Sequence, residues 1–225
     1  MKQGREHLGL TQQEAAAQLG VSQPYLSLLE AGARRVPAKL AKKAAKVYGA
    51  APTALPLDES FKKPGLLQAQ RFAEDLATLG YPGFSYLHST RKRNPAVLLL
   101  EALAQSDLEG RLVEALPWLV LRYPQLDWEW LVPRAKLYNL QNRLGYVADL
   151  AYKVAENKSV EPFTLSNLAR QKATLEEARL VVEGTLCHDS LSQAERSWLR
   201  ETRPPAATHW NLLTDLQPEQ LRYVV

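Results

Sequence analysis

Three things that this sequence lacks limit what it can encode. Cys187 is its single cysteine, so no disulfide can form within the chain, which is typical of a protein kept in a reducing compartment. Its longest apolar runs, AVLLL (96–100) and WLVL (118–121), fall far short of the roughly 18 residues that a membrane span needs. No positively charged segment leads into an apolar segment near Met1, as a secretion signal would require. We therefore expect a cytoplasmic protein without membrane contacts.

Catalytic motifs are also absent. The chain has no GxGxxG, GxxxxGK[ST], GxSxG or HExxH motif, and its four histidines lie far apart in the sequence, with no zinc-ligand set around Cys187 and His188. One pattern resembles the Arg-x₄₋₆-His element of HEPN ribonucleases: Arg203 and His209 are separated by PPAAT, although the two prolines fit that element poorly. We expect no enzymatic activity, no cofactor and no metal, and we keep a helical ribonuclease as an alternative.

No strand-like alternation of apolar and polar residues extends beyond about four positions, and no repeat recurs at a fixed period. The pattern beyond residue 64 predicts helices throughout, at 66–79, 95–105, 109–122, 128–156, 164–186 and 193–200, with 109–122 distorted or restarted at Pro117. We expect an all-α protein: a small N-terminal domain over residues 1–57, a linker at 58–64 (DESFKKP), and a larger helical bundle over 65–225 that serves interaction, dimerisation or sensing.

The larger predicted domain contains every tryptophan of the chain. Trp128 and Trp130 are two residues apart on a predicted helix and therefore point in different directions. Tryptophan is common both in cores and at interfaces. The spacing therefore indicates that one of the two lies at an interface or domain junction.

Charge is unevenly divided between the two predicted domains. The whole chain has a formal net charge of +4, but residues 1–64 alone carry +5 and the remainder −1. A positive field confined to the N-terminal part is expected if that part meets a polyanion.

Residues 11–32, TQQEAAAQLGVSQPYLSLLEAG, predict two short helices joined by a sharp turn. Thr11 with Glu14 has the spacing of a capping box, and Gly20 ends the first helix. Ser22 is a second N-cap residue, and Pro24 stands just inside the start of the next helix. This is a helix-turn-helix arrangement, whose second helix can enter the major groove of DNA. An ordinary pair of packed helices is the alternative.

The residues around this motif resemble the helix-turn-helix module of Xre/Cro/C1-type transcription regulators. The resemblance rests on Arg5, GLTQQEAAAQLGVSQPYLSLLEAG (9–32), Pro37 and AKVYG (45–49). In that family the first helix usually begins several residues earlier, and only MKQGREHLG precedes the motif here. We therefore expect a short first helix, unless the true start lies upstream.

The resemblance implies roles for individual residues. Gln12 would bind a phosphate, and Gln23 and Tyr25 would face base edges, where glutamine suits adenine. Arg34 and Arg35 would bind phosphate or reach toward the minor groove, and Arg5 would form a structural ion pair with Glu30. The lysines at 39, 42, 43 and 46 share one helix face, which an ordinary solvated surface would also explain. The predicted DNA-binding set is Gln12, Ser22, Gln23, Pro24, Tyr25, Ser27, Leu28, Arg34, Arg35 and Lys39.

The function that these observations favour is sequence-specific DNA binding by a transcription regulator, and we expect a repressor. Regulators of this kind bind paired half-sites, so we expect a homodimer on a palindromic operator. Xre-type domains with an additional domain resemble antitoxins of toxin–antitoxin operons, which implies a cognate toxin protein as a partner. A stand-alone regulator that senses a ligand is the alternative. The sequence does not identify the operator, the ligand or the toxin.

Overall fold

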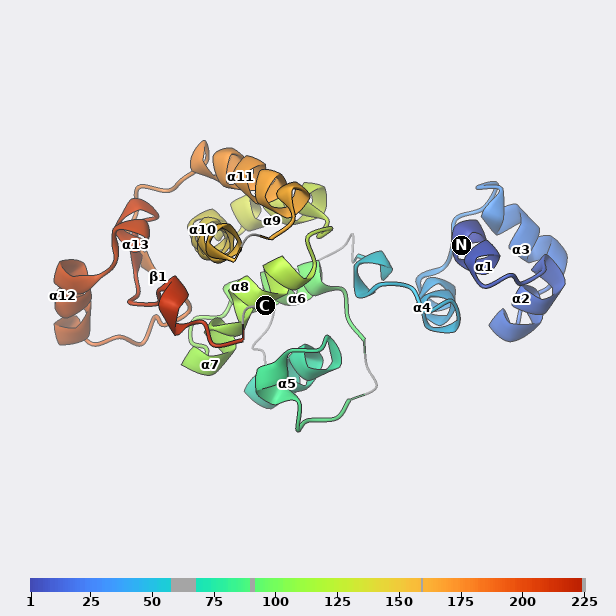
Figure 1. Ribbon diagram of the computed structural model, residues 1–225, viewed down its shortest axis with the longest axis horizontal. Helices are drawn as coiled ribbons and strands as arrows, with labels where there is room; N and C mark the ends of the chain where they lie inside the picture. Colours follow the sequence, from blue (N-terminus) through green and yellow to red (C-terminus); the bar gives the residue numbers. More distant parts are fainter. Residues whose placement is uncertain (58–67, 90–91, 159, 224–225) are drawn as a thin grey trace. The chain divides into compact units, whose positions relative to one another are not determined.

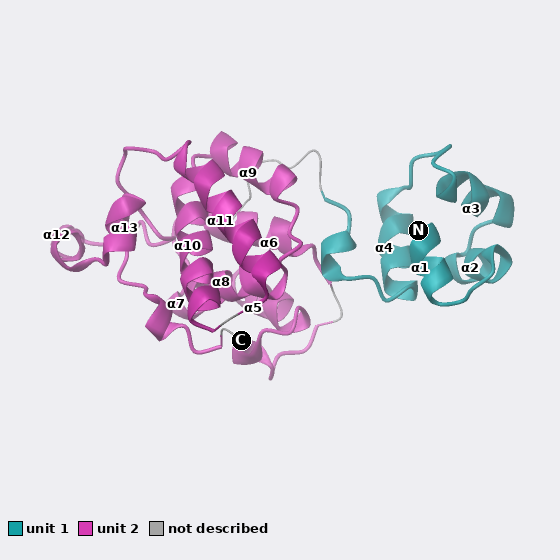
Figure 2. Ribbon diagram, turned by 45° about the horizontal axis from the view of Figure 1, so that its top comes forward, with its two compact units in different colours: residues 1–59 teal, residues 60–225 magenta. Residues whose placement is uncertain are grey.

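The computed structural model describes residues 1–57, 68–89, 92–158 and 160–223. The chain divides into two compact units, Met1–Glu59 and Ser60–Val225, which Figure 2 colours separately. Within the described residues every regular element is helical except one pair of two-residue strands, so the predicted all-α class is confirmed (Figure 1). The linker predicted at 58–64 lies outside the described residues.

Unit 1 consists of four short α-helices followed by a 3₁₀ turn. They are α1 (Lys2–His7), α2 (Gln12–Leu19), α3 (Gln23–Glu30), α4 (Ala38–Val47) and η1 (Pro52–Ala54). Thr11 and Glu14 form the reciprocal capping box at the start of α2, and Ser22 Oγ accepts a hydrogen bond from the amide of Tyr25 at the start of α3. Between the helices Gly20 has φ 69°, a left-handed conformation that glycine adopts without strain. The first helix is short, as expected.

The core of unit 1 is small. Its buried members come from α2, α3 and the end of α4: Ala15, Ala16, Leu19, Leu26, Leu29, Ala44 and Tyr48. The alanines of α2 allow α3 and α4 to approach closely. Since a domain of this size buries little apolar surface, its polar ties contribute a larger share of its stability.

Unit 2 is a helical bundle around a central helix. Its elements are α5 (Ala69–Thr78), η2 (Pro82–Phe84), α6 (Pro95–Leu103), α7 (Gly110–Val113), α8 (Ala115–Arg122), α9 (Trp128–Leu137), α10 (Gln141–Asn157), α11 (Pro162–Glu176), β1 (Gly184–Thr185), α12 (Gln193–Thr202), α13 (Pro205–His209), β2 (Leu212–Leu213) and η3 (Pro218–Gln220). Figure 1 shows α10 nearly end-on, with α8, α9 and α11 packed around it. Residues 144–151 of α10 are all buried, as this central position requires.

The last part of unit 2 returns to α10. Trp210, which follows α13, is 1% exposed, and a Cβ added at Gly145 would lie only 2.2 Å from its Cζ3 atom. The indole therefore lies directly on the backbone of α10. Beyond it, β2 pairs in parallel with β1, in the register Gly184 with Leu212 and Thr185 with Leu213.

Arg143 ties three separate segments together. Its guanidinium donates hydrogen bonds to the carbonyl oxygens of Leu103, Gln105 and Thr185, and it forms an ion pair with Asp189 at 2.9 Å. Beside it Cys187 is fully buried, and burial raises the pKa of its thiol to about 11.

Three predicted helices of unit 2 were wrong in extent. The helix predicted at 128–156 is two helices, because Asn139 takes a left-handed conformation (φ 58°) between α9 and α10. The helix predicted at 109–122 breaks at Glu114 rather than at Pro117, since a proline ring clashes with the carbonyl four residues before it. The helix predicted at 164–186 ends at Glu176, because the Asn142 side chain binds both backbone polar groups of Leu180 and holds that segment extended.

The expectation that Trp128 or Trp130 would lie at an interface or domain junction stays a prediction, and neither side chain is left on an open surface. Their exposed fractions are 6% and 7%. Two faces of α9 are covered because this helix contacts both α6 and α10. In addition, the guanidinium of Arg134 lies 4.4 Å from the ring centre of Trp130. Within the described ranges, each helix is either too short or too polar to cross a lipid bilayer.

Candidate nucleic-acid interface

The outer face of α3 carries most of the predicted DNA-binding residues. Leu26 and Leu29 point into the core of unit 1, and this fixes the rotation of the helix. As a consequence Ser22, Gln23, Pro24 and Leu28 are exposed and Tyr25 and Ser27 are half-buried. Unit 1 therefore leaves the beginning of α3 open to solvent, with its polar side chains accessible.

The side-chain amide of Gln23 is held by a chain of hydrogen bonds that leads into unit 1. Gln23 Nε2 donates to Gln12 Oε1 at 2.8 Å, and Gln12 Nε2 donates to Glu30 Oε2 at 3.0 Å. The Glu30 carboxylate in turn accepts two bonds from Arg5, at 2.9 and 3.0 Å. Arg5 also donates to the Leu10 carbonyl oxygen at 2.9 Å. We refer to Arg5, Glu30, Gln12 and Gln23 as the amide relay.

The polarity of the amide relay is set by Glu30. An ionised carboxylate only accepts hydrogen bonds, so Gln12 must turn its NH₂ group toward Glu30 and its carbonyl oxygen toward Gln23. Gln23 must then turn its NH₂ group toward Gln12, which leaves its own oxygen and one N–H free. An acceptor beside a donor is the pattern that matches the edge of adenine in the major groove.

The Glu30 carboxylate is kept ionised by its surroundings. Its side chain is 2% exposed, and the hydrogen bonds from Arg5 lower its pKa below the ordinary glutamate range, with a smaller contribution from Gln12. Arg5 and Glu30 thus form the internal ion pair that the family resemblance implies. This pair connects α1 to the end of α3.

Positive groups lie around the exposed end of α3. The guanidinium of Arg34 lies 5.9 Å from the centre of the Tyr25 ring, so the loop after α3 and the helix itself present one surface. Arg35 and Lys39 are exposed in that loop and at the start of α4. In protein–DNA complexes such groups neutralise phosphates and position the protein, while contacts to base edges give the sequence preference.

Two features of unit 1 were not anticipated from the sequence. Gln12 was expected to bind phosphate, but its amide also connects Gln23 to Glu30. Lys43, one of four lysines on the predicted α4 face, donates to the Leu19 carbonyl oxygen at 2.8 Å and so caps the end of α2. Neither pairing has a local signature, because the partners lie 11 to 24 positions apart.

Arg203 and His209, the residues of the ribonuclease alternative, have different partners. Arg203 Nη1 donates to the Leu212 carbonyl oxygen at 3.1 Å and lies 3.3 Å from Glu183 Oε2. His209 Nε2 lies 2.6 Å from Glu176 Oε2. The two side chains therefore join different carboxylates, one in the segment before β1 and one at the end of α11.

Comparison with known proteins places the N-terminal unit in a family. The HTH_3 helix-turn-helix family model matches residues 1–55, which includes the α2–α3 pair and the amide relay. No curated protein and no solved structure gives a match to the chain. The N-terminal unit is thus similar to the helix-turn-helix domains of the Xre/Cro/C1 type, and this similarity supports a DNA-binding domain of a transcription regulator over residues 1–55.

Proposed function

We propose that the protein is a sequence-specific repressor that binds a palindromic operator as a homodimer. The observation that carries the proposal is the exposed Gln23 amide, whose orientation the amide relay fixes at the beginning of α3. The nearby Arg34, Arg35 and Lys39 would neutralise phosphates on either side of the groove, and the positive charge of residues 1–64 supports the same role. A cytoplasmic location is part of the proposal, and a catalytic step is not.

Duplexes selected from a random pool by the full chain should share a palindrome, and binding to them should weaken steeply with salt. Each phosphate contact lowers the slope of log K against log [salt] by about 0.9. Sedimentation in the presence of the selected duplex should give two chains per operator. A selected pool without a shared sequence would contradict the proposal.

Gln23→Ala and Arg34→Ala should impair DNA binding in different ways. Loss of the Gln23 amide should reduce discrimination at one base pair of each half-site by about 1–3 kcal/mol, while affinity for unrelated DNA stays unchanged. Loss of Arg34 should weaken binding to all sequences alike and reduce the salt slope by about 1 for each chain that contacts DNA. Fluorescence anisotropy with operator and mismatched duplexes measures both effects.

Gln18→Ala is the matched control for Gln23→Ala, because Gln18 is exposed on α2 and lies outside the predicted set. It should bind all duplexes as the unchanged protein does. Equal losses for Gln23→Ala and Arg34→Ala on every duplex would argue against placing α3 in the major groove.

A second candidate, an antitoxin that also represses its own operon, is favoured by the surface of unit 2. Several large apolar side chains are exposed there: Leu137, Phe163, Val181, Val182 and Trp198, with Val181 91% exposed. Each of these side chains would lose contact with water if a protein partner covered it.

If the chain is an antitoxin, the product of an adjacent gene should be toxic alone and should co-purify with it. Trp198→Glu should then lower neutralisation of that toxin at least tenfold in a growth assay, because a charge would replace an apolar contact. The affinity of Trp198→Glu for the operator should be unchanged. This measurement shows that the variant is otherwise folded. Full neutralisation by Trp198→Glu would exclude Trp198 from the contact with the toxin.

A further inference from the structure

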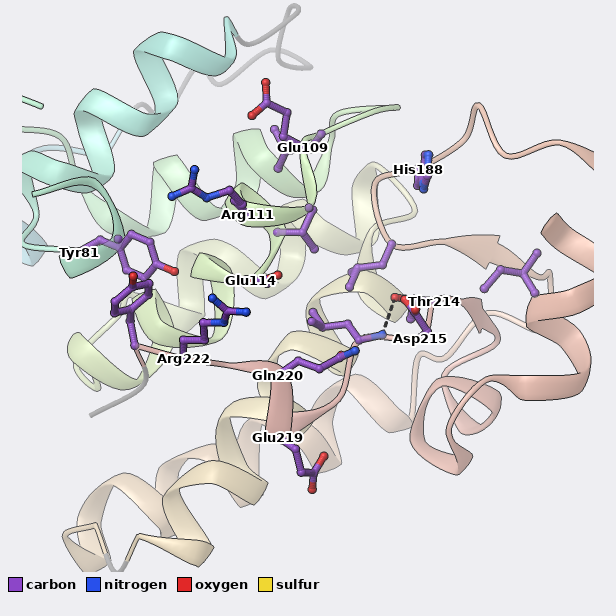
Figure 3. A pocket seen from close by; sticks show the side chains of 18 of the residues that line it. Tyr81, Glu109, Arg111, Glu114, His188, Thr214, Asp215, Glu219, Gln220 and Arg222 are labelled. Carbon is purple, nitrogen blue, oxygen red and sulfur yellow. Dashed lines mark hydrogen bonds between the residues drawn. The ribbon is translucent and has the colours of Figure 1, made fainter. Parts of the chain in front are cut away.

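A pocket of about 950 Å³ opens in unit 2, away from any residue assigned above (Figure 3). Its walls come from four stretches of the chain: η2, the segment of α7, the stretch from Leu186 to Leu199 that continues into α12, and the C-terminal stretch from β2 to Tyr223. Pockets that bind small molecules typically enclose roughly 300–1,000 Å³. The volume is therefore sufficient for a ligand of that size.

Part of the lining is apolar. Leu186, Leu199, Leu213 and Leu216 contribute to it, and each is buried. These side chains belong to the folded core of unit 2, so the apolar surface is already formed before any ligand arrives. An apolar group placed on it would lose contact with water.

The same pocket is lined by six charged side chains that have no ion-pair partner within the described part of the chain: Glu109, Arg111, Glu114, Asp215, Glu219 and Arg222. Five of the six are exposed, and Glu114 is half-buried. Side chains without a partner within the protein remain available to a ligand of the opposite charge.

The charged groups are distributed on two sides of the pocket. Figure 3 shows Tyr81, Arg111, Glu114 and Arg222 on one side, and His188, Thr214 and Asp215 on the other. On the first side the guanidinium of Arg111 lies 5.7 Å from the centre of the Phe84 ring. Two guanidinium groups and one carboxylate thus lie on one side of the pocket, and the Asp215 carboxylate lies on the other.

We propose that this pocket binds a zwitterionic ligand with an apolar body, of the amino-acid or short-peptide class. The carboxylate of the ligand binds Arg111 and Arg222, since guanidinium groups match carboxylates in geometry as well as charge. Its amine binds on the side of Asp215, and its body lies on the buried leucines. Carboxylates outnumber guanidinium groups around the pocket, so a purely anionic ligand is disfavoured.

The C-terminal stretch links the ligand to the fold. It is held to the bundle by a hydrogen bond from the Tyr146 hydroxyl to the Leu216 carbonyl oxygen, and by Tyr223, whose ring centre lies 5.5 Å from that of Tyr81. A ligand that joins Arg111 of α7 to Arg222 of this stretch adds a third link. Binding therefore stabilises unit 2 against unfolding, whether or not DNA is bound.

The test is thermal unfolding of the full chain with an equimolar pool of unblocked dipeptides and tripeptides of leucine and phenylalanine. Tryptophan fluorescence reports on unit 2, because every tryptophan of the chain lies there. At a peptide concentration of about 100 times Kd the midpoint should rise by about 5–10 °C. The same peptides with acetylated and amidated ends should give no rise, since they lack both charges.

Arg111→Gln and, separately, Asp215→Asn should each weaken peptide binding by about 10- to 100-fold, because each loses a charged hydrogen bond. Arg71→Gln, at an exposed position of α5 outside the pocket, should bind as the unchanged protein does. The proposal is overturned by a pool without effect, by blocked peptides that act equally, or by full binding in both pocket variants. Operator binding is measured separately. If it is intact in the unchanged protein and in Arg111→Gln while no peptide binds, the pocket proposal fails and the DNA-binding proposal does not.

Discussion

Gly145→Ala should destabilise unit 2 by about 3 kcal/mol or more, and the midpoint of unfolding should fall by roughly 6–12 °C. The added methyl group would lie 2.2, 2.4 and 2.6 Å from three atoms of the Trp210 ring. Neither the α10 backbone nor the Trp210 ring can shift easily, because Gly145 lies in the centre of α10 and Trp210 is almost completely buried. Overpacking of this kind forces the backbone or the ring out of place.

The chain offers its own probes and controls for this experiment. Tryptophan fluorescence and thiol labelling of Cys187 both report on unit 2, since the tryptophans and the single cysteine lie there. Gly110→Ala is the matched control: a Cβ at Gly110 would meet no atom within 4 Å, so its stability should be unchanged or slightly higher. Gly145→Ala combined with Trp210→Leu should cost less than the two single changes added together. Unchanged unfolding of Gly145→Ala would refute the packing of Trp210 on α10.

Glu30→Gln should impair both the stability and the DNA specificity of unit 1. The substitution keeps the shape of the side chain but removes the charge that faces Arg5 within the protein, and a charge left without its partner in such a place is strongly unfavourable. The midpoint for unit 1 should fall by roughly 10 °C. Because unit 1 has no tryptophan, this fall in the midpoint is measured by hydrogen exchange of the α2 and α3 amides at increasing temperature.

The effect on specificity follows from the loss of polarity in the amide relay. A glutamine at position 30 can donate as well as accept, so the Gln12 amide is free to flip and the Gln23 amide can flip with it. Discrimination for adenine at the contacted position should therefore decrease about tenfold under conditions in which unit 1 remains folded. Glu6→Gln is the control, because Glu6 also lies near Arg5 but is exposed, and it should alter neither property. Unchanged specificity in Glu30→Gln would show that Gln23 is oriented by other groups.

The same carboxylate makes unit 1 sensitive to acid. The pKa of Glu30 is lower in the folded protein than in the unfolded chain, where it is about 4.3. Its contribution is therefore complete above the unfolded pKa and is lost as the pH falls through the folded pKa. Hydrogen exchange from pH 7 to pH 3 should show this decline for α2 and α3, and it should be weaker in Glu30→Gln.

The helix-turn-helix could be predicted because its signals are local. Thr11 with Glu14, Gly20 and Ser22 each act within about three residues, and the structure has all of them in these roles. The helix limits in unit 2 could not be predicted, because they depend on distant partners. The clearest case is the end of α11 and the extended segment after it, which depend on Asn142 and Leu180, 38 positions apart.

The candidate interface shows the same limit. The exposed residues of α3 follow from the two core leucines, whose spacing is visible in the sequence. The bond between Gln12 and Gln23 depends on the angle at which α2 and α3 meet, which no residue pattern specifies. The pocket of unit 2 has no motif at all, since its walls come from segments over 100 residues apart.

The hydrogen bonds of Arg143 also determine when unit 2 can complete its folding during synthesis. Leu103 and Gln105 leave the ribosome before Arg143, and Thr185 and Asp189 leave it last. Until the final stretch emerges, part of this guanidinium remains hydrated and the bundle is incomplete. Native structure in unit 2 is therefore acquired late during translation, whereas the residues of the DNA-binding unit are already free to fold.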